Sequence, residues 1–146
     1  MNVSKDFEEL FASLNARRVK ALVVGAYAVA FHAKPRFTKD IDIFVEPAPE
    51  NAERLLEALA DFRFGSVGLP VEDFTQSGRI IQLGYPPNRI DILTSIQGVT
   101  FEAAWAGRAE GLYGSQTVYY LGKAELVRNK PAVGRPQDQM DLRWLV

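Results

Sequence analysis

Residues Val23–Val45 read VVGAYAVAFHAKPRFTKDIDIFV, and the predicted fold is arranged around this stretch. An apolar strand ends at a glycine turn at Gly25, and a short helix follows, which Pro35 ends because proline cannot continue a helix. In the next strand Asp40 and Asp42 alternate with isoleucines, and successive side chains of a strand point to opposite faces. The two aspartates are therefore predicted to share one face.

Two carboxylates on one face of a strand allow two interpretations. Like charges at close range repel, so keeping both ionised is costly unless a cation lies between them. Mg²⁺ prefers carboxylate oxygens together with water and substrate phosphates, and a glycine turn lets the backbone approach a phosphate closely. The pair predicts a metal and phosphate site, and the alternative is an edge strand whose aspartates face water.

Length and composition predict one globular domain, residues 1–146. The chain is 47% hydrophobic and 24% charged, which is typical of a single folded domain. The absence of cysteine excludes disulfides, thiolate zinc sites and cysteine nucleophiles. The net charge of -1 argues against binding to nucleic acid or membranes through charge alone. Without an apolar signal-peptide core or a membrane-length apolar run, we expect a cytoplasmic protein with no membrane partner.

The C-terminal segment, residues 123–146, is basic within this slightly acidic chain. It holds five basic and three acidic residues, a net charge of +2. We predict a helical segment that closes the site and brings positive charge to a bound phosphate. The alternative is a solvated helix that packs through Leu142 and Leu145 and whose charges serve solubility.

Periodicity and cap signals predict the other elements. Helices are expected after the cap residues Ser4 and Thr100 and over residues 50–62 and 123–129. Strands are expected over residues 19–25, 79–83, 89–95 and 117–121, with the second and third forming an antiparallel hairpin. Residues 107–115 are predicted to be a loop, and Pro131 is predicted to interrupt the helix that begins after Gly122.

A third aspartate, Asp91, lies between Ile90 and Ile92 in the second strand of the predicted hairpin. An aspartate within an apolar strand costs free energy unless it is paired or binds a cation. Asp91 is therefore a candidate partner of the D-x-D pair, and the alternative is an edge-strand aspartate that faces water. The only histidine, His32, is interpreted as a packing or capping group in place of a general base.

The glycine turn, the D-x-D strand and a third carboxylate on a later strand together resemble the nucleotidyltransferase superfamily, with its polymerase-beta-like fold. More narrowly, the chain resembles small bacterial nucleotidyltransferases of the abortive-infection toxin group (AbiEii/AbiGii-like) and their minimal relatives. The matching segments are VVGAYAVAFHAKPRFTKDIDIFV, GYPPNRIDILTSI and LVRNKPAVGRPQDQMDLRWL. This resemblance implies an α+β fold in which helices flank a mixed β-sheet.

The resemblance also implies an activity. It predicts an enzyme that transfers a nucleoside monophosphate from an NTP, such as ATP, to an acceptor hydroxyl and releases pyrophosphate. The implied catalytic and metal-binding residues are Asp40, Asp42 and Asp91, with Mg²⁺ or alternatively Mn²⁺ as cofactor. Asp91 is expected to help activate the attacking hydroxyl. Two metal ions in such a site stabilise the entering and leaving oxygens of an in-line displacement.

Further residues enter the predicted site through the same resemblance. The implied nucleotide-binding residues are Gly25, Ala26, Arg36, Thr38, Lys130 and Arg135, and the implied supporting residues are Asp138 and Asp141. The family usually has a second glycine or a serine where this chain has alanine, which has no hydroxyl to offer a phosphate, although backbone N–H contacts remain. Asp138, the first aspartate of the R-x-x-D-x-x-D-L run, is expected to orient Lys130 or Arg135. Arg36 precedes the D-x-D strand, and the alternative to a contact with phosphate is that its side chain is solvated.

The sequence leaves the acceptor, the nucleobase and the partner open. An RNA end such as that of a tRNA, a protein hydroxyl and a small molecule are the acceptors considered. A second hypothesis is a module that binds a nucleotide or a partner protein without catalysis, such as an antitoxin component, and the short chain and Ala26 favour it. A third hypothesis is one half of a toxin–antitoxin pair, with the cognate protein as partner.

Overall fold

The computed structural model describes residues 4–32, 40–62, 69–84 and 89–133, and for residues 130–133 it describes the backbone alone. Helices and strands alternate through these residues. In chain order they are α1 (Lys5–Ala16), β1 (Ala21–Val24), α2 (Gly25–His32), β2 (Asp40–Val45), α3 (Pro49–Phe62), the 3₁₀ helix η1 (Val71–Phe74), β3 (Ile80–Leu83), β4 (Arg89–Leu93), α4 (Phe101–Ala106), β5 (Ala109–Tyr113), β6 (Gln116–Tyr120) and α5 (Lys123–Val133).

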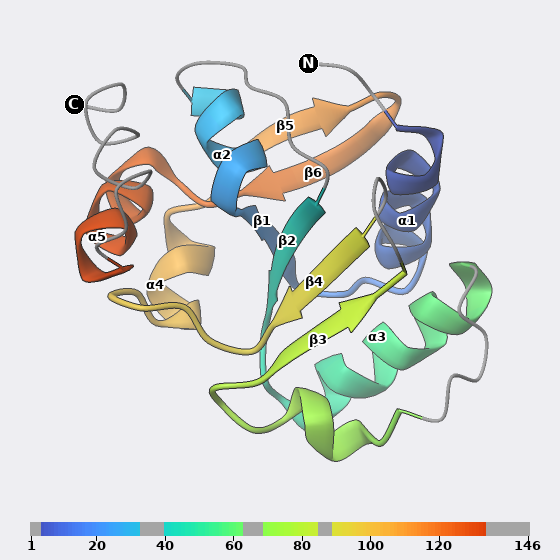
Figure 1. The fold of residues 1–146 in the computed structure, drawn as a ribbon. Coiled ribbons are helices and arrows are strands. Elements are labelled where there is room, and N and C mark those ends of the chain that lie inside the picture. Colours follow the sequence, from blue (N-terminus) through green and yellow to red (C-terminus); the bar gives the residue numbers. More distant parts are fainter. Residues whose placement is uncertain (1–3, 33–39, 63–68, 85–88, 134–146) are drawn as a thin grey trace.

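The fold is α+β, with helices flanking a six-stranded mixed sheet of order β3-β4-β2-β1-β6-β5 (Figure 1), which confirms the predicted fold class. Strand β2 lies between β1, which is antiparallel to it, and β4, which is parallel to it. Strands β3 and β4 form the predicted antiparallel hairpin. Because β2 and β4 are both interior strands, the edge-strand interpretation of their aspartates is wrong.

Each face of the sheet has its own apolar core. Helices α1 and α3 pack on the face that carries Ile41 and Ile43, and α2, α4 and α5 contribute side chains to a second cluster that includes Phe44. Side chains alternate along β2, so Asp40 and Asp42 lie on the face of Phe44. The first cluster fixes the orientation of β2, because the buried isoleucines hold the aspartates on the opposite face.

Two predicted helix caps are confirmed. The Ser4 side chain accepts a hydrogen bond from the backbone N–H of Phe7 at 3.4 Å, and the Thr100 hydroxyl accepts one from Ala103 at 3.2 Å. Each cap satisfies an N–H group that the first turn of a helix leaves without an intrahelical partner.

Two predictions about the second half of the chain are wrong. Residues 109–113 form strand β5, where a loop was expected, because they pair with β6 through a tight turn in which Gly114 has a φ of 60°. Helix α5 continues past Pro131 to Val133. A proline removes one backbone donor, and this helix is anchored to the domain before that point by the fully buried Leu126.

One buried polar residue joins the start of the sheet to α3. Asn51, which is 2% exposed, accepts a hydrogen bond from the Lys20 N–H at 2.7 Å. Its amide donates to the carbonyl oxygens of Lys20 at 3.0 Å and Glu46 at 3.1 Å. The side chain thereby satisfies the backbone where the chain enters β1 and where it leaves β2. The sequence does not reveal this role, because asparagine in a helix gives no signal of burial.

We expect Asn51→Ala to lower the free energy of unfolding by about 2–4 kcal/mol, because it leaves buried backbone groups without partners. Urea unfolding followed by circular dichroism measures this value. The matched control is Asn15→Ala, which removes an exposed amide that donates to the Thr117 carbonyl at 2.9 Å and should cost about 1 kcal/mol or less. Equal losses for the two variants would contradict the role assigned to Asn51.

Candidate functional site

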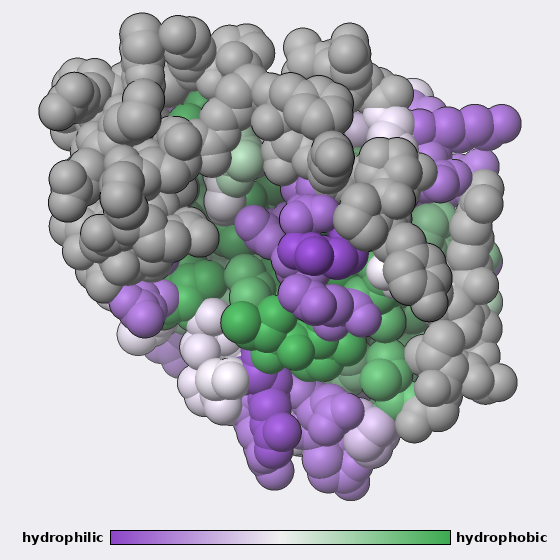
Figure 2. Space-filling model, in the orientation of Figure 1, coloured by the Kyte–Doolittle hydropathy of each residue, from purple (hydrophilic) through white to green (hydrophobic). Residues whose placement is uncertain are grey.

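The three predicted carboxylates meet where β2 and β4 begin. In the parallel register of these strands Asp42 lies opposite Asp91, and Asp40 lies opposite Arg89. Register partners on neighbouring strands share a face, so all four side chains belong to the face that carries α2. Figure 2 shows hydrophilic surface in the middle of this face, over the N-terminal ends of β2 and β4. The residue Asp91 is 8% exposed, whereas Asp40 and Asp42 are half-buried.

Helix α2 begins directly beside these carboxylates. Strand β1 ends at Val24, which pairs with Asp42, and Gly25 starts the helix with a φ of 65°. A Cβ atom at Gly25 would collide with the Oδ2 atom of Asp42, so the carboxylate lies against the glycine backbone. Glycine is required here both for its left-handed conformation and for this close approach. The first turn of α2, whose N–H groups have no partner within the helix, therefore begins beside the Asp42 carboxylate.

An arginine joins two of the three carboxylates. The Arg89 Nη2 atom lies 2.7 Å from Asp40 Oδ2 and 3.1 Å from Asp91 Oδ2, and its Nε atom lies 3.1 Å from Asp91 Oδ1. The hydrogen bonds to Asp91 are the main cause that raises the pKa of the guanidinium, and the charges of Asp40 and Asp42 add to the shift. Among the described residues, the site thus brings three carboxylates together with the Arg89 guanidinium, which contacts two of them.

Arg89 was not among the site residues predicted from the sequence. A signal was present, because residues two apart on a strand share a face and the sequence Arg89-Ile90-Asp91 therefore places the arginine beside the third aspartate. Its contact with Asp40 depends on the parallel pairing of β2 with β4, which the local sequence does not specify.

Tyr27, on α2, lies near the site, and His32 ends the same helix. Burial, together with the neighbouring Tyr113, raises the pKa of the Tyr27 phenol to about 12, and the charge of Asp40 adds to this shift. The phenol is therefore neutral at physiological pH and close enough to Asp40 to feel its charge. His32 has its Nε2 atom 2.7 Å from the Leu121 carbonyl oxygen, which agrees with the predicted packing or capping role.

The chemistry of the site suits a hard divalent cation, because carboxylate oxygens are the ligands that Mg²⁺ prefers and a cationic group already lies against two of the carboxylates. As arranged, however, the part of the chain that the structure describes contains no group of three or more His, Cys, Asp or Glu side chains able to hold a metal ion. Arg89 contacts Asp40 and Asp91, while Asp42 lies against Gly25. Metal binding by the three aspartates stays a prediction.

The remaining predicted site residues divide into two groups. Ala26 is half-buried in the first turn of α2, next to Gly25. Lys130 lies on α5, but its side chain is outside the described part. Five residues lie wholly outside the described residues, namely Arg36, Thr38, Arg135 and the supporting pair Asp138 and Asp141. The predicted phosphate clamp from the C-terminal segment therefore stays a prediction.

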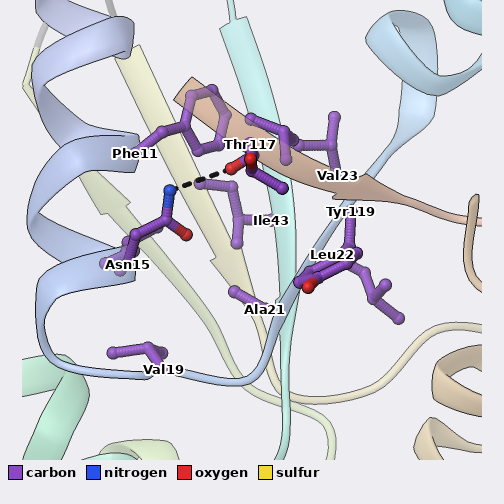
Figure 3. A pocket seen from close by; sticks show the side chains of 11 residues that line it. Phe11, Asn15, Val19, Ala21, Leu22, Val23, Ile43, Thr117 and Tyr119 are labelled. Atoms are coloured by element: carbon purple, nitrogen blue, oxygen red, sulfur yellow. Dashed lines mark hydrogen bonds between the residues drawn. The ribbon is translucent and has the colours of Figure 1, made fainter. Parts of the chain in front are cut away.

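Two hollows elsewhere in the molecule are separate from the carboxylates. A cavity of about 20 Å³ between α1 and the sheet is lined largely by apolar side chains, and Asn15, which also lines it, donates to the Thr117 carbonyl oxygen (Figure 3). This volume is about that of one water molecule. A larger open hollow lies beyond the C-terminal end of β2, between Glu46 and Glu102. The first hollow lies against the opposite face of the sheet and the second at the opposite end of β2, so neither belongs to the site.

Comparison of the chain with models of known protein families finds no match, and comparison with curated proteins finds none either. Within the described ranges, no helix has both the length and the apolar character needed to cross a membrane.

Proposed function

We propose that this protein is a Mg²⁺-dependent nucleotidyltransferase, which moves a nucleoside monophosphate from an NTP to an acceptor hydroxyl. The observation that carries the proposal is the meeting of Asp40, Asp42 and Asp91 beside the glycine that begins α2. A sheet end that combines carboxylates with the first turn of a helix, whose N–H groups lack intrahelical partners, suits a phosphate chain accompanied by divalent cations. The resemblance of the glycine turn and the D-x-D strand to nucleotidyltransferases supports the same assignment.

The chain's own residues have distinct roles in this proposal. Asp40, Asp42 and Asp91 would hold Mg²⁺, which when bound stabilises the charge that develops on the reacting phosphate. The glycine at position 25 lets the first turn of α2 come close to the phosphate chain, so that backbone N–H groups donate to phosphate oxygens. Asp91, the most buried of the three carboxylates, would accept the proton of the attacking hydroxyl.

The test is transfer of label from each of the four α-³²P-labelled NTPs in the presence of Mg²⁺ or Mn²⁺. Total RNA, total protein and a small-molecule extract serve as acceptors, because the sequence does not specify the acceptor. We expect label from at least one NTP to enter one acceptor class, and EDTA should abolish the transfer. A correctly folded protein that transfers no label from any NTP would contradict the proposal.

A second candidate function is a nucleotide-binding module without catalysis, such as an antitoxin component. The arginine that contacts Asp40 and Asp91 favours it, because a fixed guanidinium would keep metal ions out of the site. Calorimetry with each NTP separates the two functions, since binding without turnover supports this alternative. The toxin–antitoxin role and the cytoplasmic location are proposals of the same kind, and induced expression with a growth measurement tests the former.

A further inference from the structure

Arg89 lies where the three carboxylates would receive a cation. Its guanidinium contacts both oxygens of Asp91 at 3.1 Å and one oxygen of Asp40 at 2.7 Å. Side-chain exposures of 30% for Arg89, 31% for Asp40 and 12% for Asp91 place this ion-pair group at the partly buried mouth of the site. One side chain thus neutralises part of the charge of two carboxylates on neighbouring strands.

A guanidinium and a metal ion compete for these oxygens. Mg²⁺ requires carboxylate oxygens at about 2.0–2.1 Å in near-octahedral geometry, and it gives up its water ligands reluctantly. Both oxygens of Asp91 already accept hydrogen bonds from Arg89. A divalent cation bound through Asp40 and Asp91 together would lie beside the guanidinium, and the repulsion between these like charges favours Arg89 giving up at least part of its contacts.

An arginine that leaves this position needs another anion. Arg89 begins β4, and almost a third of its side chain is exposed, so its head group can turn toward solvent without unpacking the core. The planar fork of arginine matches the oxygens of a phosphate as well as those of a carboxylate. In the proposed reaction the nearest incoming anion is the triphosphate of the NTP.

We propose that Arg89 is an exchangeable internal cation, which holds Asp40 and Asp91 in place before substrate binds and transfers to the triphosphate when the nucleotide arrives with its metal ion. This inference rests on the proposed function. If Arg89 exchanges in this way, the metal ion and the triphosphate bind cooperatively. Whichever binds first moves Arg89 away from the carboxylates, so the second binds at a lower cost in free energy, and such coupling is reciprocal. Free metal ions alone should bind weakly.

The test uses the full chain, with Mn²⁺ as a paramagnetic probe and inorganic tripolyphosphate as a probe that carries no base or sugar. Electron paramagnetic resonance gives the Mn²⁺ dissociation constant without any activity measurement. We expect Arg89→Gln to bind free Mn²⁺ about tenfold more tightly than the unmodified chain and to bind metal-free tripolyphosphate about tenfold more weakly. Circular dichroism establishes that each variant is folded.

Two further variants separate exchange from simple charge. Arg89→Lys keeps the positive charge but loses the fork that contacts two carboxylates, so its Mn²⁺ affinity should lie between those of the unmodified chain and Arg89→Gln. A through-space effect of charge alone would leave Arg89→Lys equal to the unmodified chain and would overturn the proposal. The matched control is Arg54→Gln, an exposed arginine on α3, which should change neither affinity.

Two further outcomes separate a failure of the exchange from a failure of the proposed function. If Arg89→Gln binds Mn²⁺ equally or more weakly, while Asp42→Ala abolishes Mn²⁺ binding, then Arg89 only orients the carboxylates. In that case the exchange is wrong and the proposed function stands. If neither the unmodified chain nor Arg89→Gln binds Mn²⁺, both the exchange and the metal-dependent function are wrong.

Discussion

Asp42→Ala is expected to reduce nucleotide transfer by at least about a thousandfold, which corresponds to about 4 kcal/mol of transition-state stabilisation. Asp42 lies opposite Asp91 in the sheet and against Gly25 at the start of α2, so it links the proposed metal ligands to the proposed phosphate-binding turn. Removing its carboxylate takes one of the three proposed metal ligands away, while Arg89 still contacts the other two aspartates. The measurement is the rate of label transfer at saturating NTP and Mg²⁺.

Two controls make this result specific. Glu53→Gln removes an exposed carboxylate on α3, which packs against the opposite face of the sheet, and it should leave the rate unchanged. Asp42→Asn keeps the shape of the side chain, so its melting temperature should remain close to that of the unmodified chain while its activity is lost. A fully active and correctly folded Asp42→Ala variant would show that the metal assignment is wrong.

Much of the fold could be predicted because local patterns determine it. The alternation in DIDIFV fixes which face of β2 is polar, and the two cap residues fix the starts of α1 and α4. The β3–β4 hairpin follows from two strand patterns around a Gly-Tyr-Pro-Pro-Asn turn signal. In each case the decisive interactions lie within a few residues of one another.

Predictions from the sequence were wrong where tertiary contacts override local propensity. The sequence AEGLY, which forms β5, contains alanine, glutamate and glycine, all of which are depleted in strands, and it becomes a strand through pairing with β6. Gly111 fits there because a Cβ atom would collide with the Phe31 ring, which stacks on Tyr120 at a centroid distance of 4.2 Å. No pattern within residues 107–115 reveals this contact with a ring on α2.

The candidate site was predictable only in part, for the same reason. The sequence identifies Asp40 and Asp42 as a pair that shares one face of a strand, and Asp91 as a charge within an apolar strand. It does not specify that β2 and β4 are parallel neighbours with Asp40 opposite Arg89, since strands 49 positions apart pair through the whole fold. The contact of Arg89 with Asp40, which partly neutralises the carboxylates, depends on that long-range register.

Both the fold and the proposed function depend on the absence of a Cβ atom at Gly25, which begins α2. Gly25→Ala should lower the free energy of unfolding for two reasons. An L-residue at a φ of 65° costs about 1–2 kcal/mol, and the new Cβ atom would displace the Asp42 carboxylate. We also expect transfer activity to fall by at least about a hundredfold, because a displacement of about 1 Å in a catalytic group costs that much.

The matched control for this prediction is Gly78→Ala. Gly78 has a φ of 84° but nothing within 4 Å of an added Cβ, so it carries the backbone cost without the collision. Gly25→Ala should therefore lose more stability than Gly78→Ala, and only the former should lose activity. In a double-mutant cycle the Gly25→Ala cost should shrink in the Asp42→Ala background, where the carboxylate it strikes is gone. Additive costs would show that strain in the turn, and not contact with Asp42, makes this glycine necessary.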